Sequence, residues 1–130
     1  MRFLKRTEKE QGQTMAEFAV VLPVLMILIL GVIQFGIVFN NYITLTDAAR
    51  AAARKGAVSR ESGNPSADCI AAGVAAAADL KQTKLSVSCS STWKPGADVT
   101  VTATYPYRVK LLGFVMKSGN LTTQIKERVE

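Results

Sequence analysis

The sequence predicts an α+β protein: a long N-terminal transmembrane helix that continues into a small head with a second helix and a roughly three-stranded antiparallel sheet. An apolar run extends from Phe18 to Phe39, with Gln34 as its one polar side chain. The helical spacing of apolar residues then continues to Lys55, and from Leu85 the spacing changes to two. We therefore expect a helix first and a sheet in the second half of the chain.

The apolar run has the length of a membrane span. As a helix it is roughly 33 Å long at about 1.5 Å per residue, enough to cross a hydrocarbon core of about 30 Å. The alternative is a buried core helix, but a chain of 130 residues offers too little protein to surround such a run. Pro23 lies inside the run and predicts a kink that membrane helices tolerate. We expect a transmembrane segment over about residues 18–39.

The basic residues favour one orientation of this span. The net charge is +6, but the basic residues do not form one block, so we expect no nucleic acid partner. One basic group precedes the run closely, and another follows it at a greater distance: Arg2, Lys5, Arg6 and Lys9, then Arg50, Arg54, Lys55 and Arg60. The positive-inside bias acts most strongly on a short flank near the membrane. This predicts a single-pass protein of the cytoplasmic membrane, with its N-terminus in the cytoplasm and its C-terminal head outside.

Two cysteines lie in the predicted head. Cys69 and Cys89 both follow the apolar run, so they would occupy an oxidising space where a disulfide persists. A bond between them would close a loop of about 20 residues and contribute roughly 3 kcal/mol. The alternative is a pair of buried free thiols. Because the chain has no histidine and few ligands, we expect no metal and no cofactor.

The head begins where the long helix ends. Gly56 is the expected stop, so the long helix is assigned to residues 13–57 and the small extracytoplasmic head to residues 58–130. Before that stop, one face of the helix carries an apolar stripe of Tyr42, Leu45, Ala49 and Ala52. A second helix is expected from Ser66, as its N-cap, to Leu80.

Alternation of apolar and polar residues predicts the strands. A turn at Pro95-Gly96 separates the first two, and the second is expected to end at Tyr105-Pro106-Tyr107. The alternating residues are Leu85, Val87 and Cys89, then Val99, Val101 and Ala103, and finally the run from Leu121 to Val129. The apolar segment Lys110–Met116 is expected to fold over the sheet, the alternative being an exposed patch for a neighbouring subunit.

No catalytic constellation is visible in the sequence. It has no histidine, no phosphate-binding glycine loop and no serine in a nucleophile-elbow setting, and its acids are scattered singly. We therefore expect that the chain is not an enzyme.

An unusual pattern precedes the apolar run. A secretory signal peptide has an apolar region of about 7–15 residues, shorter than this run. Here Gly12 is followed at the fifth position by Glu17 and then by Phe18. This arrangement at the head of an apolar helix resembles the class III signal of type IV pilin-like proteins. The pair Glu17-Phe18 is similar to the Glu-aromatic pair of the tight-adherence (Flp) branch, whereas Gln13 departs from the type IVa pattern.

Two further regions carry the same resemblance. The stretch from Ala48 to Ala57 resembles the segment that follows the membrane helix in TadE-like proteins, with alanines where the family often has glycine or glutamate. The order of strands, apolar segment and a last strand ending in Arg128-Val129-Glu130 resembles the TadE-like C-terminal region. The resemblance implies a pseudopilin or minor pilin.

The resemblance also implies a processing step and partners. A prepilin peptidase would cut after Gly12 on the cytoplasmic face, so residues 1–12 would be a leader and Gln13 the new N-terminus. The implied partners are this peptidase, other pilin or pseudopilin subunits that pack through the N-terminal helix, and an inner-membrane assembly platform. The expected role is structural, in pilus assembly and adhesion. The alternatives are a major pilin with an enlarged head and a membrane-anchored binding module that never enters a filament.

The chemistry of Glu17 agrees with this implication. An ionised acid within a bilayer costs several kcal/mol, so it needs a partner. Cleavage after Gly12 creates a positive amine on Gln13, four residues from Glu17. Glu17 can neutralise that amine within one chain, or pair with a neighbouring subunit and set the register of a filament. The alternative is a favourable charge at a helix N-terminus.

Overall fold

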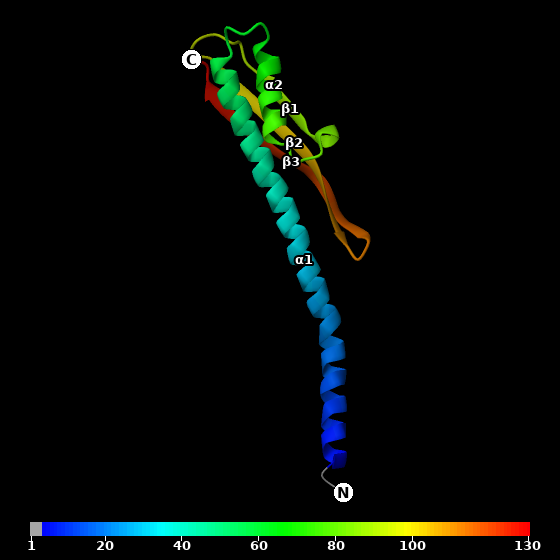
Figure 1. Cartoon of the computed structure of the whole chain (residues 1–130). Helices are drawn as coiled ribbons and strands as arrows, with labels where there is room; N and C mark the ends of the chain where they lie inside the picture. The colour runs from blue at the N-terminus through cyan, green and yellow to red at the C-terminus, as the bar shows by residue number, and fades with distance from the viewer. Residues whose placement is uncertain (1–3) are drawn as a thin grey trace.

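The computed structural model describes the backbone of residues 4–130 and the side chains of residues 12–130. Helix α1 (Leu4–Val58) is followed by helix α2 (Pro65–Ala76), a short 3-10 turn η1 (Gln82–Lys84) and three strands. The head sits at one end of α1, and the N-terminal half of α1 projects away from it (Figure 1). The predicted α+β fold, with a long apolar helix that carries a small head, is confirmed.

Helix α1 is longer than predicted at both ends. It begins at Leu4 and passes through Gly12 without a break, because one glycine costs a helix only about 1 kcal/mol. It also passes Gly56 and ends at Val58, so the predicted stop at Gly56 is wrong. Gly56 instead allows close packing, since a β-carbon there would lie 3.0 Å from Val99 Cγ1 and 3.2 Å from the Cys69 sulfur. The axis of α1 bends in its N-terminal half, which holds Pro23 (Figure 1).

Helix α2 is capped by a different residue from the predicted one. Asn64 is the N-cap, and its Oδ1 accepts a hydrogen bond from the backbone N–H of Ala67 at 3.1 Å. Pro65 occupies the first helical position, where a missing N–H costs nothing. Ser66 therefore lies inside the helix, and its assignment as the N-cap is wrong. The helix ends at Ala76, before the predicted Leu80. The carbonyl of Ala77 accepts hydrogen bonds from Gln82 Nε2 at 2.9 Å and from the N–H of Leu80 at 3.0 Å.

The three strands form the predicted antiparallel meander. Strands β1 (Ser86–Ser90), β2 (Asp98–Leu111) and β3 (Phe114–Arg128) are hydrogen-bonded in the order β1-β2-β3. At the centre of the sheet, Val101 of β2 pairs with Cys89 on one side and with Ile125 on the other. The chain end is tied to α1, because the N–H of Glu130 donates to the carbonyl of Ala57 at 3.1 Å.

Strands β2 and β3 continue well beyond the predicted ends. Strand β2 passes through Pro106, which is tolerated because β1 pairs only as far as Thr104 and leaves β2 an edge strand from there on. Strand β3 begins at Phe114, before the predicted Leu121. The expectation that Lys110–Met116 folds over the sheet is therefore wrong: this segment is the tip of the β2–β3 hairpin, and most of it is exposed.

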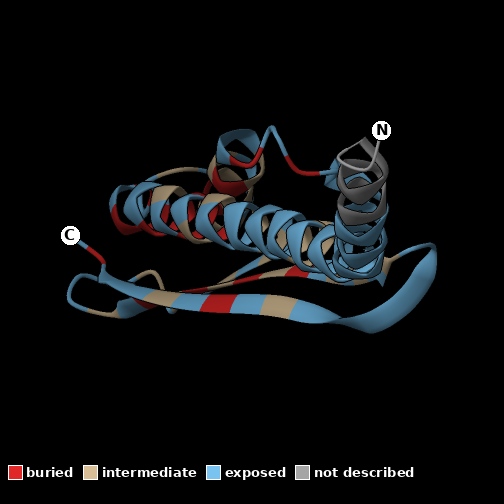
Figure 2. Cartoon of the chain, turned by 90° about the horizontal axis from the view of Figure 1, so that it is seen from below, coloured by how far each residue is buried: buried red, intermediate tan, exposed pale blue. Residues whose placement is uncertain are grey.

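The core lies where α1 crosses one face of the sheet. Figure 2 shows the sheet as one layer, α1 across it, and α2 against α1. The predicted stripe on α1 is confirmed for Leu45, Ala49 and Ala52, which are buried, whereas Tyr42 stays exposed. Alanines dominate the helix side of the core and valines the sheet side, so the backbones approach closely. The buried apolar residues are Leu45, Ala48, Ala49, Ala52, Ala53, Cys69, Ala77, Leu80, Val99, Val101, Ala103, Tyr105 and Val129.

Candidate functional site: the apolar helix and its acidic head group

The predicted processing residues lie at the end of α1 that is remote from the head. Gly12, Gln13, Glu17 and Phe18 are all exposed. The structure brings two of them together: Gln13 Nε2 donates to Glu17 Oε1 at 3.3 Å, one helical turn apart. A cut before Gln13 would place the new α-amine on this same residue. The first turn of a shortened helix would then hold a positive amine and Glu17 together.

The acid lies at the beginning of an apolar surface. Between Glu17 and Phe39, most large apolar side chains of α1 are exposed, and only Leu30 and Val38 are half-buried; Phe18 is 60% and Phe35 is 75% accessible. By length and composition, the part of α1 from Gly12 to Val58 can cross a membrane, and none of its most apolar stretch is buried within the chain. Such a surface must be covered by lipid or by other protein, because leaving it in water forfeits about 25 cal/mol per Å².

Two glycines interrupt this apolar surface. A β-carbon built on Gly31 or Gly36 meets no atom within 4 Å. Neither glycine is therefore needed for contacts within the chain. Small residues on membrane helices let other helices approach closely. The structure leaves both positions open to a neighbouring helix.

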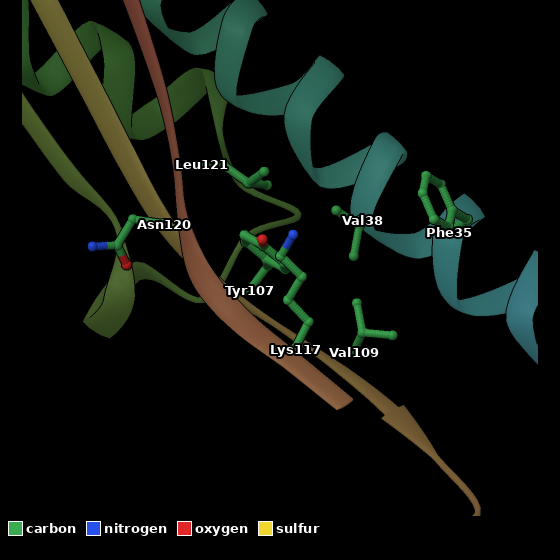
Figure 3. Close-up of a pocket in the computed structure, with 7 residues that line it drawn as sticks. All are labelled: Phe35, Val38, Tyr107, Val109, Lys117, Asn120 and Leu121. Carbon is green, nitrogen blue, oxygen red and sulfur yellow. The ribbon is translucent and has the colours of Figure 1, made fainter. Parts of the chain in front are cut away.

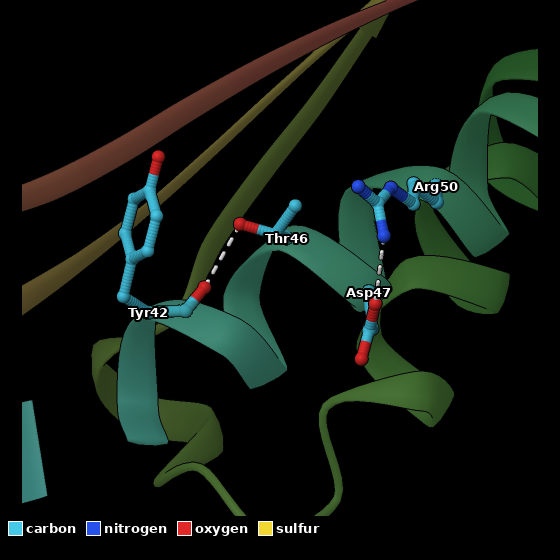
Figure 4. Close-up of polar contacts among 4 residues, drawn as sticks. All are labelled: Tyr42, Thr46, Asp47 and Arg50. Carbon is cyan, nitrogen blue, oxygen red and sulfur yellow. Dashed lines mark hydrogen bonds and ion pairs between the residues drawn. The ribbon is translucent and has the colours of Figure 1, made fainter. Parts of the chain in front are cut away.

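The polar residues that follow the apolar surface stabilise α1 locally. Thr46 Oγ1 donates to the carbonyl of Tyr42 at 2.9 Å, and Arg50 pairs at 3.4 Å with Asp47, three residues before it in the helix (Figure 4). Both members of the ion pair are 61% accessible, so its contribution to stability is small. These contacts mark the part of α1 that faces water.

The two cysteines are joined in the head. The sulfurs of Cys69 and Cys89 are 2.00 Å apart, and their Cα atoms are 6.4 Å apart. The bond ties α2 to β1, and Cys69 is fully buried beneath Gly56 of α1. The disulfide therefore closes the head at the point where both helices meet the sheet.

A cleft of about 340 Å³ separates α1 from the β2–β3 hairpin. Phe35 and Val38 line it from the helix, while Tyr107, Val109 and Lys117 line it from the strands (Figure 3). The lining is mostly apolar with one cation, and it lies next to the apolar surface of α1. Among the side chains of residues 12–130, no three histidine, cysteine or acidic residues come together in a way that could hold a metal ion.

The β2–β3 hairpin is the feature of this region that the sequence did not predict. A run of apolar residues around Gly113 was visible, but nothing local showed that β2 and β3 extend to meet there. Leu112 and Gly113 form a two-residue turn, with φ of 49° and 88°. Turns of this kind favour Asn-Gly. With leucine in the first position, the sequence did not indicate a hairpin turn here. The pairing of Leu111 with Phe114 decides its position.

Comparison with known families agrees with the long helix. The model of the TadE family, described as TadE-like protein, matches residues 12–54. The match begins at Gly12, includes Glu17 and the whole apolar surface, and ends before the head. The same comparisons matched no curated protein and no solved structure. Over residues 12–54, therefore, the chain is similar to the TadE-like family.

Proposed function

We propose that this chain is a minor pilin or pseudopilin of a tight-adherence pilus. It waits in the cytoplasmic membrane with its N-terminus inside and its head outside, and a prepilin peptidase cuts it after Gly12. It then enters the pilus through α1, and its role there is structural, in assembly and adhesion, rather than enzymatic. The observation that carries this proposal is the apolar surface of α1, none of whose most apolar stretch is buried within the chain, with Glu17 at its beginning.

The geometry supports a change in what covers the apolar surface of α1, from lipid in the membrane to other helices in a filament. In the membrane, lipid covers the apolar surface from Phe18 to Phe39. In a filament, the same surface packs against the helices of other subunits, and the open positions at Gly31 and Gly36 allow close contact. Most of this surface is clear of the head, because the buried core packs on α1 from Leu45 onward and only the β2–β3 hairpin lies beside Phe35 and Val38.

Glu17 supports assembly rather than simple anchoring. A membrane anchor gains nothing from a carboxylate at the edge of its apolar run. The contact of Gln13 with Glu17 at 3.3 Å shows that residue 13 and this acid share one face of α1. After cleavage, the amine of Gln13 provides the missing positive partner, either in the same subunit or in the next. The head favours a minor subunit over a major one.

Intact-mass measurement on membranes tests the processing step. We expect a mass that corresponds to residues 13–130 when the prepilin peptidase is active and to the whole chain when it is not. Gly12→Ala should block the cut without disturbing the fold, since nothing lies within 4 Å of an added β-carbon. Gly31→Ala is the matched control, because it makes the same change in the same helix with equally open space. If the chain keeps residues 1–12 in cells with an active peptidase, the pilin proposal fails and a membrane-anchored binding module takes its place.

A further inference from the structure

The tip of the β2–β3 hairpin exposes a cluster of apolar side chains. Leu112 is 66%, Phe114 is 75% and Met116 is 66% accessible, and Val115 beside them is exposed too. These side chains add nothing to the core of the head, because the buried core of β3 begins only at Thr123. Hairpin turns are normally polar and glycine-rich. An exposed apolar tip of this kind marks a contact surface.

The backbone conformation of the turn makes a leucine at position 112 more unusual. Leu112 has φ of 49°, a left-handed conformation that asparagine, aspartate and glycine adopt far more readily. Asn-Gly would suit the same two-residue turn better than Leu-Gly. The sequence therefore keeps a large apolar side chain where folding of the hairpin disfavours it. A role in contact with something outside the chain accounts for this choice.

The charges around the tip are all positive. Arg108, Lys110 and Lys117 are exposed on the two strands that lead to it. Between Asp98 and Glu127 the chain has no acidic residue. An apolar end flanked by basic side chains is the pattern by which peripheral segments bind an anionic lipid surface.

The hairpin also lies at the same level along α1 as the apolar run. It runs back from the head beside α1, toward the N-terminal half of that helix (Figure 1). Its stem faces Phe35 and Val38, which belong to the last turns of the apolar run ending at Phe39 (Figure 3). Beyond Val109 the strand continues for roughly 10 Å to the turn, at about 3.3 Å per residue. The tip therefore reaches the level of the apolar run.

We propose that the hairpin tip, residues 111–116, inserts into the anionic lipid surface on the head side of the membrane while α1 spans it. This inference rests on the membrane span of the proposed function, but on neither cleavage nor assembly. Leu112, Phe114 and Met116 enter the acyl region, and Lys110 and Lys117 extend their side chains so that the amines reach the lipid phosphates. The head is thereby held at two points, the helix and the hairpin, which fixes its tilt on the membrane.

Lipid fits the tip better than a second copy of this chain does. From Phe18 to Phe39 the apolar helix of another copy carries no carboxylate, so it offers the basic residues beside the tip no partner. Anionic lipid supplies both an apolar interior and negative phosphates at the required spacing. The mostly apolar cleft lined by Phe35 and Tyr107 lies beside the apolar run and suits an acyl chain.

Tryptophan quenching in vesicles tests the proposal. The full chain is reconstituted in phosphatidylethanolamine–phosphatidylglycerol vesicles that contain lipid brominated on its acyl chains. Trp93 is the single tryptophan and lies at the opposite end of the sheet from the hairpin tip, so it serves as the unquenched control. In a Trp93→Phe background, Phe114→Trp reports the tip and Phe35→Trp reports the span. We expect blue-shifted emission that brominated lipid quenches from both new tryptophans, and no quenching of Trp93, which packs against the core of the head.

The other outcomes separate the two proposals. Quenching of Phe35→Trp without Phe114→Trp overturns the hairpin insertion and leaves the anchor in place. Quenching of neither overturns the membrane span and the insertion together. A blue shift of Phe114→Trp that grows with protein density and is not quenched by brominated lipid shows a second copy, which also overturns the proposal.

Two variants test the chemistry of the contact. Lys110→Glu with Lys117→Glu should lower the ratio of inserted to free tips by about fivefold for each basic side chain lost, and neutral phosphatidylcholine vesicles should lower it similarly. Leu112→Asn should weaken insertion while the turn keeps its shape. If quenching is unchanged in both variants, the proposed contact is wrong.

Discussion

Gly73 of α2 lies so close to Ala52 of α1 that a β-carbon built on Gly73 would sit 3.0 Å from the Ala52 Cβ atom. Val87 of β1 closes the other side at 3.1 Å, and the carbonyl of Ala48 lies 3.4 Å away. The two helices and the sheet therefore meet at a point where only glycine fits. The small head is densely packed at this contact, because alanine and glycine let the backbones of the helices and the sheet approach closely.

The first prediction concerns this contact. Gly73→Ala should lower the free energy of unfolding of the head by about 1 kcal/mol, because overpacking of about 1–3 kcal/mol outweighs the gain of about 1 kcal/mol in helix propensity. Urea unfolding of the full chain in detergent, followed by the fluorescence of Trp93, measures it. Gly63→Ala is the matched control, since its added β-carbon meets no atom within 4 Å. A variant at Gly73 as stable as the control would contradict the packing.

The second prediction concerns the disulfide. Replacing Cys69 and Cys89 together by alanine should lower the free energy of unfolding by about 3 kcal/mol, because the bond closes a loop between residues 20 apart in sequence. The same urea titration measures it, and reduction of the unchanged protein should have the same effect. Two reactive thiols in protein taken from the cell envelope would show that the bond does not form there.

The third prediction separates the observed cap of α2 from the one that the sequence indicated. Asn64→Ala should cost about 1 kcal/mol, since it leaves the N–H of Ala67 without its acceptor. Ser66→Ala should change stability little, because Ser66 lies within the helix. Paired measurements of the two variants by thermal unfolding decide between the caps, and a larger loss at Ser66 would refute the assignment.

The fourth prediction concerns the turn of the hairpin. Leu112→Asn should stabilise the head by about 1 kcal/mol, since asparagine adopts the left-handed conformation at lower cost. Lys110→Ala serves as a control on the same hairpin, where no such backbone constraint applies. Urea unfolding compares them. A destabilised Leu112→Asn variant would mean that the leucine contributes to the fold, which would remove one reason for assigning it an external partner.

The fifth prediction concerns Glu17. Glu17→Ala should leave membrane insertion intact, since it removes a costly charge, but it should reduce the amount of the chain in pili sheared from cells. Glu61→Ala provides the control, because Glu61 is an exposed glutamate of the head that pairs with Arg60 at 3.3 Å. Quantitative immunoblotting of membranes and of sheared pili measures both pools. Normal incorporation of Glu17→Ala would overturn the assembly role.

Much of the fold was predictable because its signals are local. The span of α1 follows from uninterrupted apolar residues, and the meander follows from the alternation around Val87, Val101 and Ile125. The position of Glu17 and Phe18 after Gly12 likewise needs no structure to be noticed. The long helix, the second helix and the order of the strands depend on periodicity and turn residues, which short stretches carry by themselves.

Element ends and close contacts could not be predicted in this way. Gly56 was expected to end α1, and only its packing beneath Val99 and Cys69 shows why a glycine belongs inside the helix. Gly73 gave no indication of its role, because its constraint comes from Ala52 and Val87, far away in the sequence. Distances between segments that the chain brings together are absent from any local pattern.

The sequence by itself determined that this chain has a membrane-length apolar helix with an acid at its beginning, a disulfide-capable head and a TadE-like N-terminal region. Only the tertiary structure decided what happens to the apolar segment Lys110–Met116. Pairing of Val109 with Lys117 and of Leu111 with Phe114 carries that segment away from the core and beside α1. Backbone hydrogen bonds between β2 and β3, rather than the hydrophobicity of the segment, placed it on the surface.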